Sequence, residues 1–194
     1  MSGSITLMRH GRPVCAQDGW VGAQAFADWI ARYDAAEVAP AGVPEGARAA
    51  AADAVHVVCS ELPRALTSVA ALGRVPSLCD ARFGEAALPW APWRGLRLPV
   101  AAWAGVARLL WLAGWSGQVE SRRAARLRAA WCARRLAELA ADGPVLLVGH
   151  GIMNRMIAAE LCAGGWESCG RAGARYRSGY WSAQRFAPGS ERPL

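Results

Sequence analysis

Residues 4–13 read SITLMRHGRP, an apolar run that ends in a cluster of basic residues around a glycine. The run 4–8 predicts a buried β-strand, because apolar and β-branched residues follow one another without a charge. Arg9, His10, Gly11 and Arg12 come directly after it. In α/β proteins, ligands bind beyond the carboxyl ends of the strands, so this is a position for functional side chains.

Two further apolar runs end in the same way. Residues 55–59 (VHVVC) are followed by SELPR, which ends in Arg64, and residues 145–148 (VLLV) are followed by Gly149, His150 and Gly151. Continuous apolar strands that alternate with helical stretches indicate a mostly parallel sheet with helices on both faces. We therefore expect His10, Arg64 and His150 to meet at one edge of an α/β sheet.

The remaining periodicity predicts the elements around this sheet. We expect helices at 23–33, 61–73, 100–115, 121–141 and 152–162, a loop and a loose helix within 35–54, a loop at 82–99, and a last, edge strand at 180–186. No linker or repeat divides the chain, so residues 1–194 are expected to form a single domain.

The composition limits the class of protein. The 194 residues are 54% hydrophobic and 19% charged, which excludes a disordered chain. The net charge of +7 favours acidic or phosphorylated partners. No zinc-finger spacing, RNA-binding aromatic signature or dense basic run supports nucleic-acid binding. The oligomeric state is not predicted.

Cysteine spacing and hydropathy bear on location. None of the six cysteines forms a C-x-x-C pair, and reduced thiols in a cytoplasmic protein are the expected state. No signal peptide is expected ahead of a strand that starts near residue 4. Residues 100–115 (VAAWAGVARLLWLAGW) are short for a membrane span and include Arg108, so we expect a buried or half-buried helix there.

The residues gathered at the sheet edge suit phosphoryl transfer. A neutral imidazole attacks phosphorus, and arginine forks match phosphate oxygens. A helix that starts after a strand adds N–H donors for an anion, and Gly11 and Gly151 allow close backbone approach. Glu85, in FGEAALP, is the candidate proton donor for a leaving oxygen. His56 alternates within a strand and is expected to be a packed or surface residue.

The segments LMRHGRP, SELPRALTSVAAL, FGEAALP and VLLVGHGIMNRMIA resemble, in order, the signature blocks of the histidine phosphatase superfamily, also called phosphoglycerate-mutase-like. The resemblance implies a three-layer α/β sandwich with a mostly parallel central sheet. It implies that His10 is the phosphorylated nucleophile, that Arg9, Arg64 and His150 form the phosphate pocket, and that Glu85 is the proton donor. Gly11, Arg12 and Gly151 are the further candidate phosphate contacts; no metal or organic cofactor is expected.

The sequence also departs from the mutase branch of that family. Arg12 and Pro13 stand where mutases carry a glutamate or glutamine and a small polar residue, and the chain is shorter. These departures favour a phosphatase acting on a small phosphorylated substrate or a phosphoprotein. A phosphomutase, a phosphohistidine phosphatase and a non-catalytic phospholigand-binding protein remain alternatives. Arg12 itself is either a phosphate contact or a surface residue.

Residues 89–115 are the candidate lid. Five tryptophans lie in it, at positions 90, 93, 103, 111 and 115, and packing against the domain is preferred over stacking on a ligand. Arg94 and Arg97 are the lid charges expected to meet a second anionic group. Whether Arg171, Arg175 and Arg177 reach the site is left open.

Overall fold

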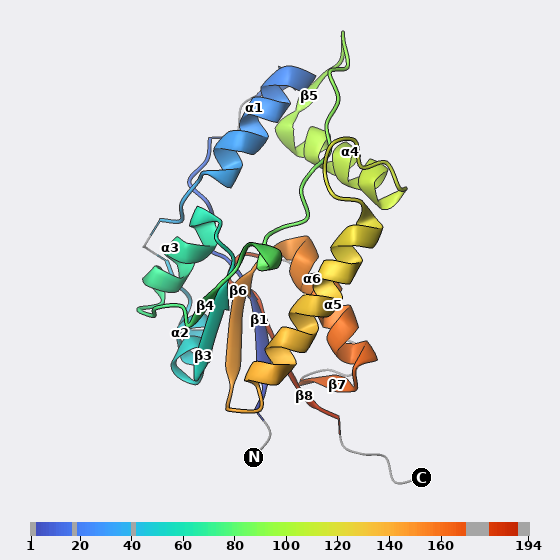
Figure 1. Ribbon diagram of the computed structural model, residues 1–194. Coiled ribbons are helices and arrows are strands. Elements are labelled where there is room, and N and C mark those ends of the chain that lie inside the picture. The colour runs from blue at the N-terminus through green and yellow to red at the C-terminus, as the bar shows by residue number, and fades with distance from the viewer. Residues whose placement is uncertain (1–2, 17–18, 40–41, 170–178, 190–194) are drawn as a thin grey trace.

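A central sheet organises the chain (Figure 1). In the computed structural model, which describes residues 3–16, 19–39, 42–169 and 179–189, six strands pair in the order β4-β3-β6-β1-β8-β7. Their bounds are β1 Ile5–Arg9, β3 His56–Cys59, β4 Leu78–Cys79, β6 Val145–Gly149, β7 Trp166–Cys169 and β8 Ala183–Pro188. The pairs among β4, β3, β6 and β1 are parallel, whereas β8 is antiparallel to both of its neighbours.

The register of β1 and β6 brings together the segments that follow them, which carry His10 and His150. Ile5 pairs with Val145, and the parallel register continues to Arg9 opposite Gly149. The backbone N–H of His10 then donates to the carbonyl of Gly149 at 3.0 Å. His10 and His150 therefore leave adjacent strands at the same level, as the apolar runs predicted.

Helices cover both faces of the sheet, which confirms the predicted three-layer α/β fold (Figure 1). Helices α2 (Glu45–Ala52) and α3 (Pro63–Ala71) lie on one face, and α5 (Arg122–Leu139) and α6 (Gly151–Ala163) on the other. Successive strand residues alternate between the faces. Leu147 packs in the cluster with α5 and α6, whereas Val148 packs in the cluster with α2 and α3.

A smaller group of elements stands beyond the carboxyl ends of the central strands (Figure 1). It comprises α1 (Ala23–Asp34), α4 (Val100–Leu112) and the antiparallel pair β2 (Trp20–Gly22) and β5 (Arg97–Pro99). We call it the cap. It has its own buried cluster, in which Phe26 stacks on Trp103 with ring centroids 5.7 Å apart.

Within the described residues, no helix has both the length and the apolar character needed to cross a bilayer.

The structure corrects three sequence predictions. The last strand is not at the edge, because β8 lies between β1 and β7, and β7 was not predicted. It also begins at Ala183, since residues 179–181 form a turn. The expected loop at 82–99 contains β5 and part of the short 3-10 helix η1 (Ala81–Phe83). The pairings of β5, β7 and β8 join segments that lie far apart in the sequence, and the periodicity of a short segment does not encode such pairings.

Candidate active site

His10 follows β1 and is held in one ring orientation. Its side chain is 1% exposed, and Nδ1 lies 2.7 Å from the carbonyl oxygen of Gly11. A carbonyl oxygen only accepts, so Nδ1 carries the proton and donates it. The proton-free nitrogen of the neutral ring is then Nε2, whose lone pair is available to an electrophile.

The surroundings of His10 keep it neutral. Burial lowers its pKa from 6.5 to about 3, with further lowering by the positive charges of Arg64 and Arg9, against a raising effect of the Gly11 hydrogen bond. A charged imidazole has no nucleophilic lone pair, so the depressed pKa preserves the reactive form at neutral pH.

Gly11 shapes the loop that carries His10. A Cβ at this position would lie 2.5 Å from Cγ1 of Val38 and 2.5 Å from the ring of Trp181, so only glycine fits. The Gly11 N–H donates to Oγ of Ser68 at 2.9 Å. The amide expected to contact phosphate is therefore already bound within the protein, and Gly11 acts by positioning His10.

His150 lies beside His10, with ring centroids 5.1 Å apart. Its Nε2 is 2.6 Å from Oγ of Ser60, the residue that follows β3. Burial, above all, lowers the pKa of His150 well below 6.5, and His10, Arg64 and Arg9 act in the same direction. Within the described part of the chain, its buried Nδ1 has no hydrogen-bond partner.

Asn154 fixes the turn that presents His150. Its Nδ2 donates to the carbonyl of Met8 at 2.9 Å, and its Oδ1 accepts from the His150 N–H at 3.3 Å. A Cβ on Gly149 would lie 2.2 Å from that Oδ1, so the side chain of Asn154 reaches β1 only across a glycine. The GHG turn is therefore tied to the strand that carries His10.

The two predicted phosphate arginines have different surroundings. Arg64 is 1% exposed, and its Nη1 donates to the carbonyl of Tyr33 and to Oδ1 of Asp34, both at 3.1 Å. A guanidinium suits the C-terminal end of α1, where carbonyl groups concentrate negative charge. Its buried Nε has no hydrogen-bond partner among the described residues. The guanidinium of Arg9 lies 4.4 Å from the ring centroid of Tyr180.

Two tyrosines lie at the site, Tyr180 beside His10 and Tyr33 beside Arg64. The Tyr180 ring lies 5.7 Å from the His10 ring, centroid to centroid, and Arg64 lies 4.8 Å from the Tyr33 centroid. Burial, reinforced by the neighbouring Tyr180 side chain, raises the pKa of Tyr33 to about 12. Its hydroxyl is therefore protonated at neutral pH.

Glu85 lies against the N-terminus of α6. Its Oε1 accepts from the N–H groups of Ala86, Ile152 and Met153 at 3.0–3.2 Å, and its Oε2 accepts from Ile152 at 3.2 Å. The anion-binding start of the helix thus holds this carboxylate. A Cβ on Gly151 would lie 3.7 Å from both Oε2 of Glu85 and Cζ of Arg9, so both side chains come close to this glycine.

A cavity of about 650 Å³ opens between the cap and the sheet edge. Arg9, Arg64 and Glu85 line it, together with residues of α1 and α4. His10 and His150, at 1% and 0% exposed, are not among the residues that line it. We call this space the cap cavity.

Arg12, Arg94 and Arg97, which the sequence offered as site residues, do not line the cap cavity. Arg12 is exposed and lines a separate hollow with Pro13 and Trp181, so the structure does not bring it to Arg9 and Arg64. Arg94 and Arg97 are exposed, and Nη2 of Arg97 donates to the carbonyl of Trp20 within the cap. Arg171, Arg175 and Arg177 lie outside the described residues.

The tryptophans of the candidate lid, residues 89–115, pack against the protein, which is the alternative that the sequence favoured over stacking on a ligand. Trp103 and Trp111 are 1% exposed, and Trp93 stacks on both Trp103 and Trp115. Among the described residues, the tryptophan that lines the cap cavity is Trp29 of α1. Trp103 and Trp90 therefore pack in the buried cluster of the cap, whereas Trp111 packs in the cluster between the sheet and α5 and α6.

Sequence reasoning missed four contributors to the site. Ser60 is the partner of His150, and its place directly after a buried strand was the available signal. Asp34, the ion-pair partner of Arg64 at 3.1 Å, and Tyr180 gave no signal, because both reach the site through tertiary contacts. Arg108, a charge inside an apolar helix, lines the cap cavity and donates through Nη2 to the carbonyl of Ala86 at 2.7 Å.

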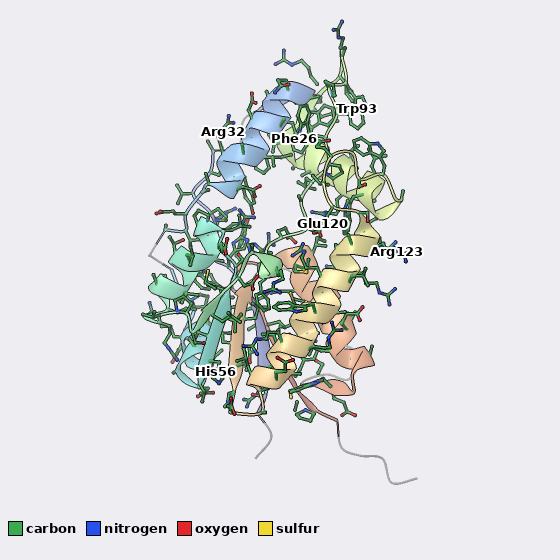
Figure 2. The ribbon with its side chains drawn as sticks, in the orientation of Figure 1. Phe26, Arg32, His56, Trp93, Glu120 and Arg123 are labelled. Carbon is green, nitrogen blue, oxygen red and sulfur yellow. The ribbon has the colours of Figure 1, made fainter. Side chains whose placement is uncertain are left out.

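The third histidine lies away from the site. His56 begins β3, and Figure 2 labels it at the end of the sheet opposite the cap, where Phe26 and Trp93 are labelled. Among the described residues, no group of three or more histidine, cysteine or carboxylate side chains is arranged to hold a metal ion.

Most of the chain matches a known protein family. Residues 43–181 match the family model for the histidine phosphatase superfamily (branch 1). That match begins after β1, so the placement of Arg9 and His10 rests on the structure described above. Among proteins of curated function, no sequence matches this chain significantly.

Solved structures share the fold at low sequence identity. The Mycobacterium tuberculosis protein of open reading frame Rv3214 is 18% identical with a TM-score of 0.60, over 95% of this chain and 91% of that one. A mycobacterial glucosyl-3-phosphoglycerate phosphatase is 24% identical with a TM-score of 0.53, over 82% and 79%. An Entamoeba histolytica phosphoserine phosphatase is 13% identical with a TM-score of 0.55, over 95% and 90%. At these identities the likeness establishes the fold.

Proposed function

Because this chain belongs to the histidine phosphatase superfamily, we propose that it is a phosphatase that hydrolyses a phosphate monoester through a phosphohistidine on His10. The observation that carries the proposal is the contact between Nδ1 of His10 and the carbonyl of Gly11 at 2.7 Å. This contact fixes the tautomer with a free lone pair on Nε2, and two arginines lie close enough to lower the pKa of the ring.

The first step is in-line attack by Nε2 of His10 on phosphorus. The N–P bond forms as the bond to the leaving oxygen breaks, and negative charge is spread over the three other phosphoryl oxygens. Arg9 and Arg64 stabilise that charge as guanidinium donors. The buried Nε of Arg64, which lacks a partner among the described residues, is a donor suited to this role.

Glu85 moves the proton in both steps. In its protonated form it gives its proton to the leaving oxygen, and the carboxylate that results then removes a proton from the water that attacks phospho-His10. Three backbone N–H groups, those of Ala86, Ile152 and Met153, donate to the Glu85 side chain, so its position does not depend on substrate. The products are the free alcohol and inorganic phosphate, and His10 returns to its neutral form.

The test compares two histidine variants. We expect His10→Asn to lower kcat for phosphate release from 4-nitrophenyl phosphate by about a thousandfold or more, the usual cost of removing a covalent nucleophile. His56→Asn, at the opposite end of the sheet, is the matched control and retains turnover. Circular dichroism and melting temperature verify that both variants fold. Wild-type turnover by folded His10→Asn would overturn the proposal.

A further inference from the structure

The cap cavity is larger than a phosphate group requires. A phosphoryl group occupies only the end near Arg9 and Arg64, whereas about 650 Å³ is within the range of pockets that bury a whole small molecule. The remaining space therefore faces the alcohol part of a phosphate ester. The side chains around that space indicate what kind of alcohol fits.

The walls away from the phosphate end are apolar. Trp29 and Ile30 come from α1, Leu62 from the loop after β3, and Ala87 and Leu88 from the loop after Glu85. Ala104 of α4 also lines the cavity. The small alanine side chains leave the width of the cavity open, whereas an aromatic residue at Ala104 would fill it.

Trp29 presents a fixed apolar surface. It stacks on Phe26 and Tyr33, with ring centroids 6.2 and 5.0 Å apart. Its indole N–H donates to the carbonyl of Ala16 at 3.1 Å, so the donor is already bound. A ligand beside Trp29 therefore meets a rigid aromatic wall, which costs little conformational entropy on binding.

Most polar groups of the cavity belong to the phosphate end. Asp34 pairs with Arg64, Ser60 with His150, and Glu85 with the start of α6. Glu61 and Arg108 are the exceptions. Glu61 is exposed in the loop after β3, whereas Arg108 uses Nη2 to hold the carbonyl of Ala86 and its buried Nη1 has no partner among the described residues. Burial lowers the pKa of Arg108, and the negative charge of Glu85 acts against that lowering. The opposite charges of Arg108 and Glu85 therefore compensate each other beside the apolar wall.

We propose that the cap cavity is a leaving-group subsite that selects phosphate monoesters of bulky, apolar, ring-containing alcohols over those of small polyhydroxy or amino-acid alcohols. The inference rests on the proposed function, because it assigns the alcohol part of the same substrate. Hydroxyl-rich leaving groups would lose hydration against Trp29, Leu88 and Ala104 without gaining hydrogen bonds there.

The first measurement varies the alcohol while the chemistry stays constant. Propyl, hexyl and 2-naphthylethyl phosphate share a primary alkyl leaving group, and glycerol 3-phosphate matches propyl phosphate in length. We expect kcat/KM to rise by about fourfold for each further buried methylene equivalent, up to the size of the cavity. Glycerol 3-phosphate or phosphoserine preferred over propyl phosphate would overturn the inference.

The second measurement fills the cavity. Ala104→Phe is expected to lower the ratio of kcat/KM for 2-naphthylethyl phosphate to that for propyl phosphate by about tenfold or more. Ala102→Phe, exposed on the same helix and outside the cavity lining, is the matched control and leaves the ratio unchanged. An equal ratio in both variants would contradict the assignment of the subsite.

A binding series separates the two proposals. Alkylphosphonates carry a P–C bond that is not hydrolysed, so calorimetry with the propyl, hexyl and 2-naphthylethyl phosphonates measures the subsite without turnover. Affinity that rises with apolar size, in a protein that hydrolyses none of the esters, supports the subsite and refutes the phosphatase. Hydrolysis of every ester with equal efficiency, and equal affinity for every phosphonate, supports the phosphatase and refutes the subsite.

Discussion

Acidification is expected to destabilise the fold through His10. The imidazole has a pKa of about 3 in the folded chain and 6.5 as its ordinary value. Below pH 6.5 the unfolded chain binds a proton that the folded chain does not, so stability is complete above that pH and falls as the pH is lowered toward 3. Each pH unit in this window costs about 1.4 kcal/mol.

The magnitude at pH 5 follows from that slope. The interval from 6.5 to 5 is about 1.5 units, so His10 alone removes about 2 kcal/mol of unfolding free energy between neutral pH and pH 5. His150 acts in the same direction, because burial also lowers its pKa well below 6.5. The His10 contribution is isolated by the variant His10→Asn, which has no imidazole at this position to titrate.

Urea unfolding at pH 7 and pH 5, in buffer without phosphate, measures the effect. The loss of unfolding free energy on acidification is expected to be about 2 kcal/mol smaller in His10→Asn than in the wild type, with the same m-value. NMR titration of the imidazole gives an independent check, since His10 is expected to stay neutral at pH 5. Equal pH dependence in the two proteins would refute the reasoning.

Three substitutions test other parts of the site. Ser60→Ala removes the hydroxyl 2.6 Å from Nε2 of His150 and leaves a buried ring nitrogen without its partner, so urea unfolding is expected to give a loss of about 1–3 kcal/mol; unchanged stability would show that water replaces the hydroxyl. Gly11→Ala brings a Cβ to 2.5 Å from Val38 and Trp181, so we expect a loss of about 1–3 kcal/mol in unfolding free energy and a lower melting temperature. A stability equal to the wild type would contradict this and mean that the turn 179–182 moves aside at no cost. Glu85→Gln is expected to lower kcat about a hundredfold or more for alkyl phosphates but less for 4-nitrophenyl phosphate, whose leaving group needs no proton; equal loss for both esters would argue against Glu85 as the proton donor.

The sheet core and its reactive edge were predictable because local sequence encodes them. Apolar runs at β1, β3 and β6 specify buried strands, and the parallel arrangement then brings His10, Arg64 and His150 to one edge. The glycines in the two turns mark places where another side chain comes close, as Gly11 and Gly149 do.

The remaining features depend on contacts between distant segments. The pairing of β8 between β1 and β7 cannot be derived from AQRFAP, whose burial alternates only in part. Asp34 becomes the partner of Arg64 only when the end of α1 lies against α3. Arg12 lies only two residues after His10, but it is exposed and lines a different hollow with Pro13 and Trp181.

The central claim is that His10 carries the phosphoryl group during turnover. A direct measurement mixes the protein with a ³²P-labelled alkyl phosphate, quenches at alkaline pH within the first turnover, and maps the acid-labile label by peptide mass spectrometry. We predict label on the peptide that contains His10, and none in His10→Asn. Steady phosphate release with no labelled peptide, or with label on another residue, would contradict the account.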